Sequence, residues 1–219
     1  MPRTARAAQK NICYHVINRG NNRSIIFHNN DDYRYFETLL ARAKKRIPIR
    51  ILAWCLMPNH FHLLLYPLQD GDLGRWMHWL LTSHVQMYLR KYDMVGRIWQ
   101  GRYKAPPIQQ DKHLLCVMRY IERNPLRAGI VQNLNDWEWS SFCRRTTSPD
   151  SLLDPAPIEL PEPWSDFVRV AITQTELESV RSSLVSGRPF GDTVWVNETA
   201  EILGLESTLR PRGRPRINR

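Results

Sequence analysis

Residues 49–68 hold two apolar runs separated by a short turn, and this pattern restricts the fold more than any other feature. The runs are "IRILAWCLM" (49–57) and "HFHLLLYPL" (60–68), and Pro58 and Asn59 lie between them. Proline and asparagine favour turns, and apolar runs of this length and composition are typical of strands. The segment therefore predicts two antiparallel core strands joined by a tight turn.

Further strand and helix patterns surround this hairpin. A β-branched and aromatic run predicts a strand at 11–21, and the prolines of 101–110 confine a short strand there to the edge of a sheet. Amphipathic patterns with helix-capping residues and charges that suit the helix dipole predict helices. These patterns occupy 29–47, 73–93 and 111–124. The order β-α-β-β-α-β predicts an α+β, ferredoxin-like or RRM-like fold, with an antiparallel sheet and helices on one face.

The composition changes after residue 145. Residues 1–145 are predicted to form one domain, and residues 146–162 are rich in Ser, Pro, Asp and Thr, as in a linker. Residues 163–205 predict a small helical C-terminal extension. The basic tail at 206–219 is expected to be disordered until it binds a partner.

Charge also changes along the chain. The net charge is +10, which separates into +13 for residues 1–145, −8 for 146–208 and +5 for 209–219. A basic body and tail favour a polyanionic partner such as nucleic acid, although charge can also serve solubility alone. The acidic stretch suggests the hypothesis that it folds over the basic body and restrains the site.

The remaining composition predicts a soluble, cytoplasmic protein. The four cysteines are scattered and none forms a C-x-x-C pair, so neither a zinc ribbon nor a disulfide framework is expected. The basic N-terminus has no apolar segment behind it, and no run reaches the roughly 18 apolar residues of a membrane helix.

His60 and His62 are the first candidate site residues. Alternate residues of a strand share one face, so Phe61, Leu63 and Leu65 predict a core face and the two histidines the opposite face. Two imidazoles on one face can hold one metal ion. The alternative is a pair of histidines at a strand end whose hydrogen bonds are satisfied and which bind no metal.

Tyr120 and Asn124 are the second pair of candidates. Their spacing of four places them on one side of a helix. A tyrosine beside a metal held by two histidines and an amide oxygen is a recognisable nucleophile arrangement. The alternative is that Tyr120 belongs to the core or its rim, as a tyrosine on an amphipathic helix usually does.

At this point the sequence resembles a known family. The segments "MPNHFHLLL" (57–65) and "YIERNPLRAGIV" (120–131) look like the signatures of the single-tyrosine HUH transposases, and more closely those of the bacterial REP-associated tyrosine transposases. Four further segments fit the same family in the same order, so the resemblance covers roughly residues 11–142. They are "HVINRGNNRSIIF" (15–27), "DDYRYF" (31–36), "WQGRYKA" (99–105) and "WEWSSF" (137–142).

The resemblance implies the HUH nuclease fold and a residue-by-residue site. His60 and His62 would be metal ligands for Mg²⁺ or Mn²⁺, and Asn124 the third ligand, where some related transposases have glutamine. Tyr120 would be the nucleophile. The implied substrate is single-stranded or hairpin DNA from palindromic repeats, cleaved through a 5′-phosphotyrosine in a bacterial, nucleoid-associated protein. Relatives act as monomers or as homodimers, and both remain possible here.

Basic residues near these motifs are candidate DNA contacts. Four of them flank the proposed site in the sequence and could bind phosphate, or they could be solvated charges. They are Arg19, Arg23, Arg102 and Lys104. In the tail, Arg212 and Arg214 lie in "RPRGRPR" (210–216), which resembles the minor-groove-binding core of an AT-hook. The alternative is a tail that only raises non-specific affinity.

Three other functions compete with this interpretation. A histidine-triad phosphohydrolase needs a third alternate histidine, and position 64 is leucine. A non-catalytic RRM-like binder would leave His60, His62 and Tyr120 without a role, and the usual RRM signature is absent. The third is a domesticated relative that binds DNA but cuts it poorly. Such a protein would carry the same residues.

Overall fold

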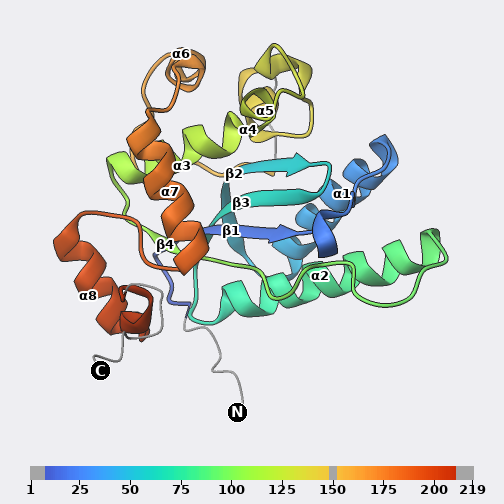
Figure 1. Cartoon of the computed structure of the whole chain (residues 1–219), viewed down its shortest axis with the longest axis horizontal. Coiled ribbons are helices and arrows are strands. Elements are labelled where there is room, and N and C mark those ends of the chain that lie inside the picture. The colour runs from blue at the N-terminus through green and yellow to red at the C-terminus, as the bar shows by residue number, and fades with distance from the viewer. Residues whose placement is uncertain (1–7, 148–151, 211–219) are drawn as a thin grey trace, which may run out of the picture.

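A computed structural model describes residues 8–147 and 152–210 (Figure 1). Its centre is a four-stranded antiparallel sheet in the order β2-β3-β1-β4. The strands are β1 (Cys13–Arg19), β2 (Ile49–Met57), β3 (His60–Pro67) and β4 (Pro107–Ile108). This is the predicted ferredoxin-like arrangement, in which the hairpin of the two apolar runs forms one side of the sheet.

The β2–β3 turn sets which side chains face each way. Met57 pairs with His60 across the two-residue turn at Pro58 and Asn59, which fixes the register of both strands. Phe61, Leu63 and Leu65 then point to one face, where they are fully buried in the larger hydrophobic core. A shift of one residue would reverse the faces, so the turn also determines where the histidines lie.

Two helices cover the face that carries Phe61. They are α1 (Asn30–Arg46) and α2 (Asp72–Lys91). Residues of α1 such as Phe36 and Leu39 are fully buried in the same cluster as Trp76 and Leu80 of α2. The helix prediction is correct here, and the ends of both helices lie within two residues of the predicted ones.

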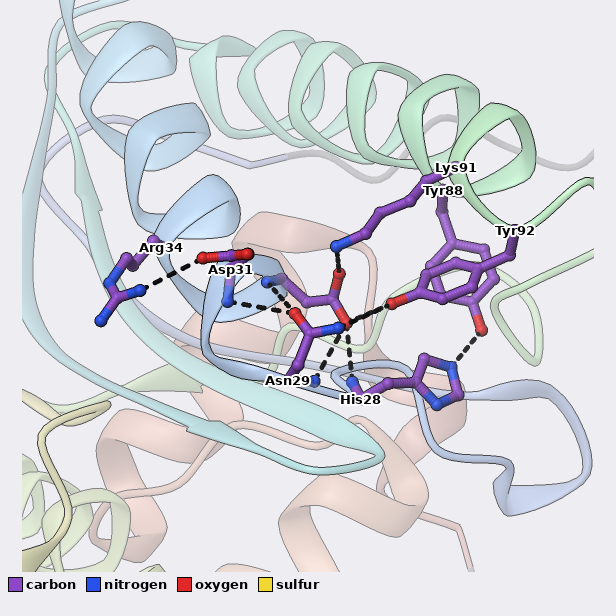
Figure 2. A network of polar contacts seen from close by, with 8 residues as sticks. His28, Asn29, Asp31, Arg34, Tyr88, Lys91 and Tyr92 are labelled. Carbon is purple, nitrogen blue, oxygen red and sulfur yellow. Dashed lines mark hydrogen bonds and ion pairs between the residues drawn. The ribbon is translucent and has the colours of Figure 1, made fainter.

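A polar network joins the start of α1 to the end of α2 (Figure 2). Asn29 caps α1 by accepting hydrogen bonds from the amides of Asp31 and Asp32. The buried Asp32 carboxylate accepts further bonds from Lys91 Nζ and Tyr92 Oη, both at 2.6 Å. Burial would raise the pKa of Asp32, but these bonds outweigh it and lower the pKa below its usual range. The network therefore stabilises the contact between the two helices as an ion pair.

The opposite face of the sheet is also covered, which the prediction of helices on one face did not include. α3 (Lys112–Glu122) packs there, because Leu114, Val117 and Ile121 enter a second core with strand residues such as Leu64. The short helix α4 (Asn124–Arg127) follows directly. The sheet is therefore enclosed on both sides, and the histidine face lies under α3.

The chain then continues through further short elements. These are α5 (Ser141–Thr147), α6 (Trp164–Arg169), α7 (Gln174–Ser186) and α8 (Thr193–Leu203), with 3-10 turns at Asn21–Arg23, Leu134–Asp136 and Glu206–Thr208. None of the helices in the described ranges has the length and apolar character needed to cross a membrane.

Buried polar contacts attach the later helices to α3. The fully buried carboxylate of Glu122 accepts hydrogen bonds from Ser141 Oγ at 2.6 Å and Trp164 Nε1 at 2.7 Å. Arg119 forms an ion pair with Glu176 of α7 at 2.7 Å. These bonds hold α6 and α7 beside the helix that carries Tyr120. The division at 146–162 into two regions stays a prediction.

Candidate functional site

A cavity of about 600 Å³ opens on the α3 side of the sheet. The end of β1, the start of β3, the segment 100–104, α3, α4 and α7 all contribute to its lining. His60, His62 and Tyr120 line it together, although they come from two separate motifs. The structure thus brings three of the four proposed catalytic and metal-binding residues into one cavity.

Strand pairing places the two histidines. His60 lies opposite Arg19, and His62 lies opposite Ile17, so all four side chains share the face that α3 covers. The ring centroids of His60 and His62 are 5.0 Å apart, and the Tyr120 ring lies 5.6 Å from that of His62. The prediction that Phe61, Leu63 and Leu65 share one face and the two histidines the other is confirmed.

The Nδ1 atoms of both histidines are already engaged. His60 Nδ1 lies 2.6 Å from Asn59 Oδ1, which can only accept, so His60 donates and keeps a lone pair on Nε2. His62 Nδ1 lies 2.9 Å from Nε2 of His15 on β1. In both rings Nε2 is therefore the nitrogen that remains for a ligand.

Both imidazoles are neutral in the folded protein. Burial, together with the charges of the nearby Arg19 and Arg127, lowers the pKa of His60 to about 3. Burial, followed by the neighbouring His15 and His60, keeps the pKa of His62 well below its usual value. Neutral imidazole is the form that binds a metal ion.

Asn124 occupies a different setting from the histidines. It starts α4, is fully buried, and is not among the residues that line the cavity. Its Nδ2 donates to the Tyr120 carbonyl oxygen at 2.9 Å, and its Oδ1 accepts from Arg127 at 2.6 Å. The side chain thus links the tyrosine helix to Arg127, and its role as a metal ligand remains a prediction.

The residues present suit a divalent cation in part. Two neutral imidazoles that line one cavity suit such an ion as a pair of ligands. Within the described residues no group of three His, Cys, Asp or Glu side chains could hold a metal. The remaining ligands would therefore have to be oxygens from an amide, water or a phosphate, as is usual for Mg²⁺ and Mn²⁺.

Tyr120 is held between aromatic rings and a cation. Its ring makes edge contacts with His15 and His62 at centroid distances of 5.8 and 5.6 Å. The guanidinium of Arg127 lies 5.5 Å from the centroid of the tyrosine ring. Tyr120 is only 4% exposed, so few orientations are open to it.

Positive charge surrounds the cavity. Among the described residues, its lining includes five cationic side chains and no carboxylate. The cations are Arg19, Arg102, Lys104, Arg127 and Arg181. Such a lining favours an anionic substrate such as a phosphodiester backbone.

The structure divides the predicted DNA contacts. Arg19, Arg102 and Lys104 line the cavity. Arg23 is exposed in the Asn21–Arg23 turn and does not line it. Arg212 and Arg214 lie outside the described residues. The DNA-binding role of each of these residues stays a prediction.

Sequence reasoning missed four residues at this site. His15 and Asn59 orient the histidine rings, and Arg127 contacts both Tyr120 and Asn124. All three lie inside the quoted motifs. Asn59 and Arg127 are close to the candidates in the sequence, whereas strand register brings His15 to His62. Arg181 of α7 is far from every motif, and no local pattern identifies it.

The C-terminal region reaches the cavity through α7. Arg181, Leu184 and Val185 are the described lining residues of the acidic stretch 146–208, and the one charged group among them is positive. Glu176 of the same helix is paired with Arg119, one residue before Tyr120. The hypothesis that this region restrains the site remains a prediction.

Comparison with known proteins agrees with the class that the fold and site define, the tyrosine transposases that cleave and join DNA. The family model described as "Transposase IS200 like" matches residues 8–124, which include both histidines and Tyr120. The chain belongs to this family. The predicted family and the predicted class of enzyme are confirmed.

Individual relatives carry more specific names than the family model. A REP-associated tyrosine transposase of Escherichia coli is 26% identical over 131 residues, which cover 60% of this chain and 76% of that protein. A Haemophilus influenzae protein provisionally given the same name is 30% identical over 120 residues, covering 50% and 68%.

A solved structure has the same fold. It is a REP-associated tyrosine transposase bound to a REP hairpin, and it matches with a TM-score of 0.55 and 22% identity over 74% of this chain and 93% of that one. At this identity the match confirms the fold class alone.

Proposed function

We propose that this protein is a metal-dependent single-stranded DNA endonuclease and strand transferase. Its substrate would be hairpin-forming DNA from palindromic repeats. The observation that carries the proposal is that His60, His62 and Tyr120 meet in one cavity whose lining includes five cationic side chains and, among the described residues, no carboxylate. The hairpin substrate is suggested by the relatives, which are named for REP sequences, one of them in complex with a REP hairpin.

The covalent step uses Tyr120. The phenol oxygen attacks the scissile phosphorus, an O–P bond forms, and the bond from phosphorus to the 3′ oxygen breaks. The tyrosine loses its proton, and the released 3′ oxygen takes one up to become a 3′-hydroxyl. The 5′-phosphotyrosine keeps the energy of the phosphodiester, so a new 3′-hydroxyl can reverse the step and join strands without a nucleotide cofactor.

His60 and His62 would hold Mg²⁺ or Mn²⁺ through Nε2, with Asn124 as the proposed third protein ligand. The bound ion would supply Lewis-acid polarisation of a phosphate oxygen. Arg127 is placed to stabilise negative charge at the tyrosine, because its guanidinium lies 5.5 Å from the ring. Arg19, Arg102 and Lys104 would hold the neighbouring phosphates.

A covalent-trapping gel tests this function. The protein is mixed with labelled single-stranded hairpin oligonucleotides and Mn²⁺ or Mg²⁺, then denatured in SDS. We expect a labelled band at the protein's mass that disappears with Tyr120→Phe and with His62→Ala. Tyr66→Phe is the control, because Tyr66 lies near the far end of β3 from His60 and does not line the cavity.

Two results would contradict the proposal. Persistence of the covalent band in Tyr120→Phe would exclude this nucleophile. Tight binding without a covalent band, across a broad set of hairpins, would favour a relative that binds DNA and does not cut it.

A further inference from the structure

His15 and His62 form a buried pair of imidazoles behind the cavity. Each residue is 1% exposed, and Nε2 of His15 lies 2.9 Å from Nδ1 of His62. His15 is on β1, two residues from Ile17, which pairs directly with His62. The two rings are thus diagonal neighbours on the sheet face under α3, a position from which aromatic side chains can reach each other.

The direction of this hydrogen bond determines what His62 can do. A neutral imidazole carries one N–H, so one ring must donate and the other accept. The two facing nitrogens are 2.9 Å apart and both rings are buried, so a single proton lies between them. If His62 donates from Nδ1, its Nε2 has a free lone pair. If His15 donates, the proton of His62 is on Nε2, which then cannot bind a cation.

His60, the other proposed metal ligand, also has a hydrogen-bond partner at Nδ1. His60 Nδ1 lies 2.6 Å from Asn59 Oδ1, an atom that only accepts. An acceptor at Nδ1 of each ring leaves both Nε2 atoms as ligands. The same arrangement at His62 requires His15 to accept.

We propose that His15 is a positioning residue that accepts a hydrogen bond from His62 Nδ1 and so fixes the orientation and tautomer in which His62 binds a divalent cation. The inference rests on the proposed metal site. His15 also contacts the Tyr120 ring, at a centroid distance of 5.8 Å. One side chain therefore orients a metal ligand and forms part of the wall behind the nucleophile.

Cation affinity tests the proposal without catalysis. Mn²⁺ binding to the DNA-free protein is followed by electron paramagnetic resonance of the free ion. We expect His15→Phe to weaken Mn²⁺ binding by about 10–100-fold, the usual effect of losing the partner of a metal-bound histidine. His15→Gln should retain most of the affinity, because its side-chain oxygen can reach the position of Nε2 and accept the same bond.

Two controls separate this effect from folding and from the site itself. His84→Phe changes another fully buried histidine, which lies on α2 in the core on the other side of the sheet, and should leave Mn²⁺ affinity unchanged. His62→Ala should abolish binding. If wild-type protein binds no Mn²⁺, or if His62→Ala binds it normally, the proposed metal site fails. If His15→Phe binds Mn²⁺ like wild type while His62→Ala does not bind it, the role of His15 is overturned and the metal site stands.

A second measurement needs no variant and no metal. Long-range ¹H–¹⁵N NMR of the wild-type protein distinguishes protonated from unprotonated ring nitrogens. We expect the proton of His62 on Nδ1 and none on Nε2. A proton on Nε2 of His62 would overturn the proposal even if Mn²⁺ binds.

Discussion

Arg127 shows how one side chain at the edge of a site can serve several residues. It donates to Asn124 Oδ1 at 2.6 Å, and its guanidinium lies 5.5 Å from the Tyr120 ring centroid. It also lowers the pKa of both cavity histidines through its charge. A planar fork of donors suits such simultaneous contacts better than a single ammonium does.

We therefore predict that Arg127→Ala slows cleavage more than it weakens DNA binding. Loss of a cation aimed at developing charge costs about 100–1,000-fold in rate in comparable sites. Single-turnover formation of the covalent complex, with hairpin affinity measured separately, checks this. Arg127→Lys should restore little activity, since it cannot hold Asn124 and reach Tyr120 together.

Arg181→Ala is the matched control for Arg127. Arg181 also lines the cavity, but no described contact joins it to Tyr120. Its loss should reduce affinity and leave the rate at saturating DNA close to that of wild type. Equal rate losses in the two variants would contradict a specific role for Arg127.

At the scale of elements, the end of β1 depends on a close approach of the backbone. A side chain at Gly20 would place its Cβ 2.2 Å from the Ser24 carbonyl oxygen. Gly20 also donates its amide to the Asn59 carbonyl at 2.8 Å, next to His60. The "NRGNN" segment thus requires glycine for packing, and the same residue connects β1 to the β2–β3 turn.

We predict that Gly20→Ala lowers the free energy of unfolding by about 1–3 kcal/mol, the typical cost of forcing an extra group into a packed region. Gly74→Ala in α2 is the control, because a Cβ there meets nothing within 4 Å. It should be neutral or stabilise the protein by up to about 1 kcal/mol through helix propensity. Urea unfolding measures both, and similar losses in the two variants would rule out this explanation.

Particular elements show how far the sequence predicts the structure. The strands at 49–57 and 60–68 are nearly correct, because their apolar composition and the Pro58 turn leave few alternatives. The helix predicted to run to 124 instead ends at Glu122, and a new turn begins at Asn124 with Pro125 in it. Proline is accepted in the first turn of a helix, so it starts α4 here as well as ending α3.

The site is predictable only where it is local. His60, His62 and Tyr120 follow from spacing and motif. The pairing of His15 with His62 depends on strand register, and the approach of Arg181 depends on how α7 packs. Neither is visible in a local pattern.

At the scale of the whole molecule, buried histidines make stability depend on pH. His84 is fully buried among Phe27, Phe36 and Trp99. Burial lowers its pKa to about 4, although the charge of Asp32 acts in the opposite direction. An unfolded histidine has a pKa near 6.5, so between about pH 6.5 and 4 the unfolded chain binds a proton that the folded chain does not.

We therefore predict that the protein loses stability as the pH falls from about 6.5 towards 4. His84 alone accounts for up to about 1.4 kcal/mol per pH unit. His84→Phe should make the dependence of the unfolding free energy on pH shallower by that amount in this window. Urea unfolding at several pH values measures it, and parallel curves for variant and wild type would contradict the prediction.

The charge distribution also makes DNA binding depend on salt. Each phosphate contact contributes roughly 0.7–0.9 to the slope of log affinity against log salt. Arg102→Ala should reduce the slope by about one contact, because Arg102 lines the cavity. Arg90→Ala, an exposed change on α2 across the sheet, should leave the slope unchanged. An unchanged slope in Arg102→Ala would remove this residue from the interface.

Asn59 limits how this scaffold can be altered. Its side chain binds His60 and the carbonyl of Arg23, and its own carbonyl binds Gly20, so a turn of two residues connects three chain segments. An inserted residue there would displace His60 and the end of β1 together. Attempts to graft new recognition loops onto this enzyme should leave 57–60 intact. They should use instead the stretch after α2, where Val95 is 95% exposed and added length meets solvent.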